Sequence, residues 1–208
     1  MSYRAFTFNA LVLTAIILLP ALFLTACGDA AKPKPEFLST DISSVNFGKD
    51  FRLADHTGNM RTLSDFKGKV VVLFFGYTHC PDVCPATMAN LATAMEKLGP
   101  QADRVQVLFV TVDPERDTPA ILQQYLSAFS PAFLGLSGNP QATKDVIKEF
   151  KIVAQKQAGE SPGHHTVDHS TGTYIFDTSG KLRLYVTSDK GADVFAHDIS
   201  ELLKASEK

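Results

Sequence analysis

A continuous run of apolar residues is the feature that most constrains the fold of this 208-residue chain. Residues 70–75 read Val-Val-Val-Leu-Phe-Phe, all β-branched, aliphatic or aromatic. A strand with one face in water would alternate between apolar and polar residues, so an uninterrupted run is typical of a strand covered on both faces. The sequence therefore predicts a layered α/β domain in which residues 70–75 form a central strand.

The remaining patterns alternate between strand and helix. Further strands are predicted at 105–112 and 133–136, helices at 84–98, 119–129, 140–150 and 193–204, and hairpins at 51–63 and 173–186. Thr118 and Asn139 are each followed by proline, which is typical of an N-cap and the first position of a helix. We expect a mixed central sheet flanked by helices, with the first hairpin as an N-terminal extension.

The first 26 residues have the pattern of an export signal. Arg4 gives a weak positive start, an apolar stretch follows, and Leu24-Thr25-Ala26 precedes Cys27 as in a lipoprotein signal peptide. The apolar stretch of about 15 residues contains Pro20, whereas a membrane-spanning helix needs roughly 20 residues. We therefore predict a signal peptide at 1–26 and lipidation of Cys27, with an uncleaved membrane anchor as the alternative.

The rest of the chain is predicted to be one tethered domain. Residues 27–43 include Lys-Pro-Lys-Pro, and proline-rich segments of this kind stay extended. Residues 44–208 are enough for one domain with a sizeable core. We expect this domain in the cell envelope, facing the periplasm or extracytoplasmic space, where glutathione does not keep thiols reduced. Two acyl chains on Cys27 would anchor it stably to a membrane.

The charge balance argues against nucleic acid as a partner. The chain has 20 Lys and Arg residues against 22 Asp and Glu residues, which gives a formal net charge of −2. Proteins that bind nucleic acids usually carry a basic patch or an arginine-rich run, and neither is visible in this sequence.

Two cysteines, Cys80 and Cys84, lie where the central strand passes into the first helix. Residues four apart on a helix have Cβ atoms about 5–6 Å apart, so a helical turn from Cys80 would bring both sulfurs to one ion. The N-terminus of a helix also favours the thiolate form. A structural or catalytic disulfide is the other interpretation of this pair.

The order of elements, with a cysteine pair after the first core strand, fits the thioredoxin fold. In thioredoxin-like proteins the loop before the last hairpin carries a cis-proline that contacts the cysteines. The corresponding residues 167–171 contain no proline but do contain His169. We therefore predict that His169 lies beside the two sulfurs. Thiolate suits Cu(I) and imidazole suits Cu(II), so the three residues would hold copper in either state.

The chain resembles the Sco/SenC family of membrane-attached, thioredoxin-like copper proteins over residues 44–206. The resemblance rests on GYTHCPDVCP at 76–85, VDPERDTP at 112–119 and DHS at 168–170. It implies that Cys80, Cys84 and His169 are copper ligands. It also implies delivery of copper to the binuclear copper centre of cytochrome c oxidase, or maintenance of its thiols. The implied partners are the copper-bearing oxidase subunit and other periplasmic copper chaperones or thiol reductases.

Two enzyme classes compete with copper delivery. A thiol-disulfide oxidoreductase would use Cys80 and Cys84 as a redox pair and would need no third donor. A thiol peroxidase would need the pattern PxxxTxxC before its reactive cysteine. Tyr77 stands in place of that threonine, and no proline stands at the matching position.

The other histidines and one aspartate are weaker candidates. His79 adjoins Cys80, and Asp82 lies between the cysteines, so either would be able to influence the site; exposed loop and turn residues are the alternative interpretation. His164 and His165 follow a Gly- and Pro-containing segment and would either collect metal loosely or fill a loop. His56 and His197 are expected to be surface or hydrogen-bonded residues.

Overall fold

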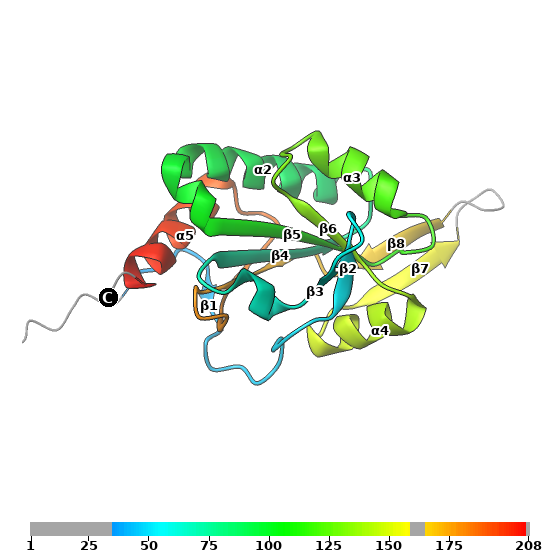
Figure 1. Ribbon diagram of the computed structural model, residues 1–208, viewed down its shortest axis with the longest axis horizontal. Helices are drawn as coiled ribbons and strands as arrows, with labels where there is room; N and C mark the ends of the chain where they lie inside the picture. The colour runs from blue at the N-terminus through cyan, green and yellow to red at the C-terminus, as the bar shows by residue number, and fades with distance from the viewer. Residues whose placement is uncertain (1–34, 159–164, 207–208) are drawn as a thin grey trace, which may run out of the picture. The chain divides into compact units, whose positions relative to one another are not determined.

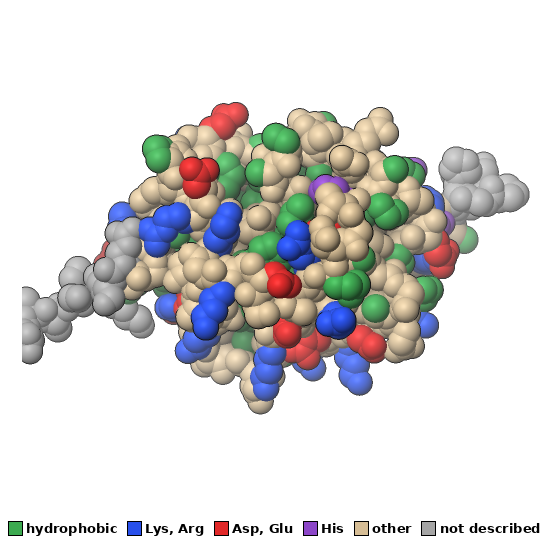
Figure 2. Space-filling view, in the orientation of Figure 1, with side chains coloured by type: hydrophobic (Ala, Val, Ile, Leu, Met, Phe, Trp, Pro, Cys, Tyr) green, Lys and Arg blue, Asp and Glu red, His purple; other side chains and the backbone are tan. Residues whose placement is uncertain are grey.

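The computed structural model describes residues 35–158 and 165–206 (Figure 1). The predicted signal peptide, the lipidation at Cys27 and the candidate His164 lie outside these residues. Within the described ranges, no helix is both long enough and apolar enough to cross a membrane. Figure 2 shows Lys and Arg side chains interspersed with Asp and Glu side chains on the face in view.

An eight-stranded mixed sheet forms the centre of the domain, in the order β1-β10-β9-β4-β5-β6-β2-β3. Its strands are β1 (Thr40–Asp41), β2 (Leu53–Asp55), β3 (Met60–Arg61), β4 (Val70–Gly76), β5 (Val105–Thr111), β6 (Leu134–Ser137), β9 (Thr173–Phe176) and β10 (Leu182–Val186). Every residue of β4 is buried. The prediction of a central strand covered on both faces is confirmed.

Strand directions place the segment before β9 next to the segment after β4. β4 runs parallel to β5 and antiparallel to β9, with Phe74 opposite Thr173. The chain that leads into β9 therefore reaches the sheet at the carboxyl end of β4. This end carries the cysteine pair.

The predicted helices are present, and their caps explain where two of them begin. The helices are α2 (Val83–Leu98), α3 (Pro119–Ser127), α4 (Pro140–Glu149) and α5 (Ala192–Ser206), with 3-10 turns at Leu63–Phe66 and Gly99–Arg104. Thr118 Oγ1 accepts a hydrogen bond from the backbone N–H of Ile121, and Asn139 Oδ1 accepts one from Ala142. In Figure 1, α2 and α3 lie on one side of the strands and α4 lies on the other.

A second, two-stranded sheet was not predicted. β7 (Ala154–Ala158) pairs antiparallel with β8 (His165–His169). Val167 is the single buried residue of these two strands, so neither has the apolar pattern by which a strand is recognised. His169 is consequently the last residue of β8, rather than a loop residue as the sequence predicted.

The folded part of the chain begins before residue 44, which is the domain boundary predicted from the sequence. β1 pairs with β10, and the backbone N–H groups of Leu38 and Ser39 donate to the buried carboxylate of Asp198 at 2.8 and 3.0 Å. The last residues of the predicted tether are therefore held against the sheet and α5.

Candidate metal centre

The structure brings together the three residues that the sequence analysis singled out. One ligand atom from each of Cys80, Cys84 and His169 lies within 4.8 Å of the other two. The Sγ atom of Cys84 is 3.5 Å from Nε2 of His169. Both cysteines are free thiols. Two sulfurs and one imidazole nitrogen thus face a common point.

The two cysteines are held differently. α2 begins at Val83, so Cys84 lies in its first turn and is fully buried. Cys80 precedes the helix, in a turn closed by its backbone N–H to the carbonyl of Tyr77 at 3.2 Å, and is partly exposed. The helix thus begins one residue before the predicted start at 84 and does not include Cys80, and the two sulfurs converge without a helical turn between them. Of the two cysteines, Cys80 is therefore the more accessible from solvent.

A glycine at the end of β4 makes room for the buried sulfur. A Cβ atom placed on Gly76 would lie 2.9 Å from Sγ of Cys84 and 2.8 Å from the ring of Phe74. Such distances are shorter than van der Waals contact, so any larger residue would displace the cysteine. The sequence does not reveal this role, because a strand-terminal glycine is also typical of an ordinary turn.

Hydrogen bonding orients the imidazole of His169. Its Nδ1 lies 2.9 Å from the carbonyl oxygen of Ser170, which only accepts, so Nδ1 carries the proton and donates. The lone pair is then on Nε2, which faces the sulfurs. The rings of Tyr77 and Phe74 meet the imidazole edge-on, with centroids 5.8 and 6.3 Å away. Burial lowers the pKa of His169, which favours the neutral, ligating form.

Burial raises the pKa of the Cys84 thiol, whereas it lowers the pKa of His169. The neighbouring Cys80 and Asp117 also raise the pKa of Cys84. The metal-free site therefore holds Cys84 as a neutral thiol. A metal ion that binds there must displace this proton, because the thiolate is the ligand.

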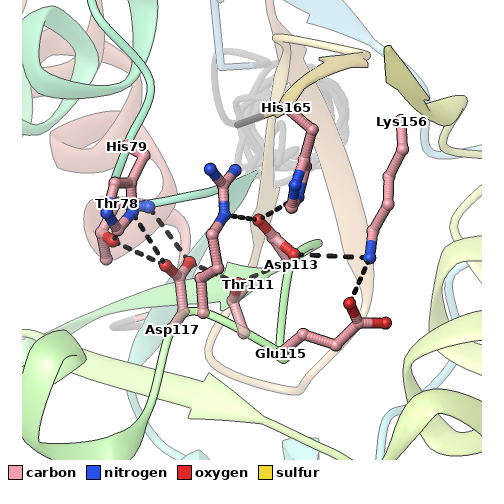
Figure 3. Close-up of polar contacts among 9 residues, drawn as sticks. Thr78, His79, Thr111, Asp113, Glu115, Asp117, Lys156 and His165 are labelled. Atoms are coloured by element: carbon pink, nitrogen blue, oxygen red, sulfur yellow. Dashed lines mark hydrogen bonds and ion pairs between the residues drawn. The ribbon is translucent and has the colours of Figure 1, made fainter. Parts of the chain in front are cut away.

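A buried aspartate fixes the loop that carries Cys80. Asp117 accepts hydrogen bonds from the Thr78 backbone N–H at 3.0 Å, from Thr78 Oγ1 at 2.6 Å and from Thr111 Oγ1 at 2.6 Å (Figure 3). Thr118 caps α3 as the sequence predicted, but the support that Asp117 gives to the cysteine loop was not predicted.

The weaker candidates lie away from the sulfurs or use their ring nitrogens elsewhere. Nδ1 of His79, a residue with 51% side-chain exposure, is 3.1 Å from Thr78 Oγ1. Asp82 is exposed at the start of α2 and makes no side-chain capping bond. Nε2 of His165 bonds to Asp113, Nδ1 of His56 accepts from Gly135, and Nδ1 of His197 contacts Asp198. Of the described histidines, His169 alone shares a cluster of potential metal ligands with the cysteines.

Known proteins share both the sequence pattern and the fold. The sequence model of the SCO1/SenC family matches residues 39–204. An SCO2-like protein of Rickettsia felis is 32% identical over 198 residues, which cover 94% of this chain and 95% of the relative. These matches extend well beyond the cysteine motif.

Solved structures of similar proteins include forms with and without copper. The copper-bound structure of Bradyrhizobium japonicum ScoI is 37% identical, covers 76% of this chain and 100% of that chain, and has a TM-score of 0.71. The apo Sco1 structure from Thermus thermophilus is 43% identical, covers 81% of this chain and 98% of that chain, and has a TM-score of 0.72. These folds confirm the predicted thioredoxin-like architecture, and the chain belongs to the SCO1/SenC family.

Proposed function

We propose that this protein is a copper metallochaperone in which Cys80, Cys84 and His169 hold the ion. The observation that carries the proposal is the convergence of two thiol sulfurs and the unprotonated imidazole nitrogen within 4.8 Å. Soft thiolates select Cu(I), and the imidazole adds a donor that suits Cu(II). Copper-bound structures of family members from Bradyrhizobium japonicum and yeast support copper as the cargo.

The unequal exposure of the sulfurs supports transfer by ligand exchange. Cys84 is buried, whereas Cys80 is partly exposed. A donor atom of the recipient would bind copper as Cys80 releases it, and Cys84 and His169 would release it afterwards. No covalent bond within either protein is broken in this exchange, and the copper keeps its oxidation state.

The proposed recipient is the copper-bearing subunit of cytochrome c oxidase, as the Sco/SenC resemblance implies. Other envelope copper chaperones or thiol reductases would supply copper and keep the cysteines reduced. We further propose that a lipid on Cys27 holds the domain at a membrane. A SCO1/SenC family lipoprotein from Bacillus anthracis, 25% identical with a TM-score of 0.65, supports this mode of attachment.

Thiol-disulfide exchange is the second candidate, favoured by the two free and adjacent thiols. The Cys80 thiolate would attack a target disulfide and form a mixed disulfide, and Cys84 would then attack Cys80. The target would gain two thiols, while the Cys80–Cys84 pair would become a disulfide. A further thiol reductant would have to regenerate the pair.

Metal analysis and absorption spectroscopy of the reduced, copper-loaded protein distinguish the two functions. A chaperone site should take up one copper and show a thiolate-to-Cu(II) charge-transfer band that disappears in Cys80→Ser and Cys84→Ser. A protein that reduces disulfides but shows neither stoichiometric copper nor this band would support the oxidoreductase and refute the proposed copper site.

A further inference from the structure

The carboxylate of Asp113 is the centre of a buried ionic cluster outside the candidate metal centre. Asp113 is fully buried, and its Oδ2 lies 2.5 Å from Nε of Arg116 and 2.9 Å from Nε2 of His165. Lys156 Nζ lies 3.8 Å from Oδ1 and 2.7 Å from Glu115 (Figure 3). Three basic side chains thus surround one carboxylate.

This cluster joins both strands of the β7–β8 hairpin to the loop after β5. Lys156 belongs to β7 and His165 is the first residue of β8, while Asp113 follows β5. β7 and β8 pair only with each other among the described strands. Because an isolated two-stranded hairpin is marginally stable in water, this hairpin depends on such outside contacts.

His165 and His169 occupy opposite ends of the same face of β8. Alternate residues of a strand share a face, so residues 165, 167 and 169 point the same way. The burial pattern agrees, since Thr166 and Asp168 are exposed whereas Val167 is buried. At the His169 end, Ser170 and Val153 exchange two hydrogen bonds of 3.0 Å. At the other end, the hydrogen bond between His165 and Asp113 holds the strand.

A second chain of contacts links the cluster to the sulfurs. The Arg116 guanidinium lies 5.8 Å from the ring centroid of Tyr77, and the Tyr77 ring meets the imidazole of His169 edge-on. Tyr77 also accepts, through its carbonyl, the hydrogen bond that closes the Cys80 turn. The cluster therefore contacts both the turn that carries Cys80 and strand β8, which carries His169. Both must be held in place for the three ligand atoms to converge.

We propose that His165 is a positioning residue, whose hydrogen bond to Asp113 holds β8 so that His169 faces the cysteine sulfurs. The role rests on the proposed copper site and adds a residue to it. Buried polar contacts of this kind are weak evidence for stability, and fixing one conformation among several is the role they are known to play in some proteins. His165 therefore acts on the geometry of the third donor and does not bind the metal itself.

The test is His165→Ala, measured for Cu(II) and Cu(I) affinity, the Cu(II) spectrum and hydrogen exchange of the β8 amides in the metal-free protein. Cu(II) affinity should fall by about 10–100-fold, which is usual when support of a ligand is lost. Cu(I) affinity should stay unchanged, because two thiolates satisfy Cu(I). The β8 amides should exchange faster. His165→Gln keeps an N–H donor and should restore part of the Cu(II) affinity.

His197→Ala is the matched control, because His197 also pairs with a fully buried aspartate, Asp198, but on α5. This variant should leave the Cu(I) affinity, the Cu(II) affinity and the hydrogen exchange of the β8 amides unchanged. Unaltered Cu(II) affinity and β8 exchange in a folded His165→Ala would overturn the inference while leaving the copper site intact. Equal losses for Cu(I) and Cu(II) would also overturn it, since they indicate general destabilisation. Absence of copper from the unaltered protein would instead refute the proposed function, and β8 exchange would still test the hairpin contact.

Discussion

The Sγ atom of Cys84 and the Nε2 atom of His169 lie 3.5 Å apart, although 85 positions separate them in the chain. The antiparallel pairing of β4 with β9 produces this proximity, because it returns the chain to the carboxyl end of β4. The imidazole is already turned toward the sulfur by its Nδ1 bond to Ser170. Strand pairing and this hydrogen bond together direct Nε2 of His169 at the sulfur of Cys84.

Loss of the His169 imidazole should change the affinity for Cu(II) far more than the affinity for Cu(I). In His169→Ala, we expect Cu(II) affinity to fall by at least about 10-fold, whereas Cu(I) affinity changes little, because two thiolates satisfy Cu(I). Titration of the reduced protein with each ion, followed by absorption spectroscopy, measures the difference. An unchanged Cu(II) spectrum in this variant would remove His169 from the site.

Oxidation should close a disulfide between Cys80 and Cys84 and abolish copper binding. The ligand atoms already lie within 4.8 Å, and a disulfide sulfur is a poor substitute for a thiolate. Mass spectrometry should show the loss of two hydrogens, and equilibrium dialysis should show no bound copper. Reduction should restore full uptake; copper retained by protein shown to carry the disulfide would contradict the assignment.

The central strand and most of the regular elements could be predicted because their signals are local. The apolar run of β4, the Thr118 and Asn139 caps and the turn between β9 and β10 lie within a few neighbouring residues. β7 and β8 could not be predicted in this way. Their residues are mostly exposed, and contacts with Asp113 and Glu115, far away in sequence, hold them in place.

The convergence of the three candidate ligands was predictable, but the contacts that support them were not. The cysteine spacing and the position of His169 are visible in the sequence, whereas the space at Gly76 and the bonds to Asp117 exist only in three dimensions. The hydrogen-bonded turn from Tyr77 to Cys80, which ends before α2 begins, was likewise not predicted.

Gly76, which leaves space for the buried sulfur of Cys84, should not tolerate an added methyl group. Gly76→Ala should cost about 1–3 kcal/mol of unfolding free energy, as overpacking usually does, and should weaken copper binding by displacing Cys84. Urea denaturation and copper titration measure the two effects. Gly191→Ala is the control, because a Cβ atom there meets nothing within 4 Å. Equal stability and copper affinity of both variants would contradict this role of Gly76.

The stability of the reduced, metal-free protein should decrease above about pH 9. Burial raises the pKa of Cys84 above its ordinary value of 9.0, so the unfolded chain loses this proton first as the pH rises. The unfolded state then binds fewer protons than the folded state, and the free energy of unfolding falls by up to about 1.4 kcal/mol per pH unit. Below the ordinary pKa the contribution of the neutral thiol is fully present.

Urea denaturation between pH 8 and 10 measures this slope. Cys84→Ala should flatten it in that window. Burial also raises the pKa of Tyr174, to about 12, and that group contributes only above the ordinary tyrosine value of 10.0. Identical slopes for the two proteins below pH 10 would show that Cys84 does not keep its proton in the folded state.

In the cell, loss of this protein should impair cytochrome c oxidase rather than general disulfide reduction. A deletion strain should lose oxidase activity most clearly when copper is scarce, and added copper should restore part of it, because mass action loads a site without its chaperone. Single replacements Cys80→Ser, Cys84→Ser and His169→Ala should each reproduce the deletion, with His197→Ala as the control that complements. The informative variant is His169→Ala, since thiol-disulfide exchange needs only the two sulfurs. Full complementation by His169→Ala, with failure of both cysteine variants, would reject copper transfer and favour the reductase.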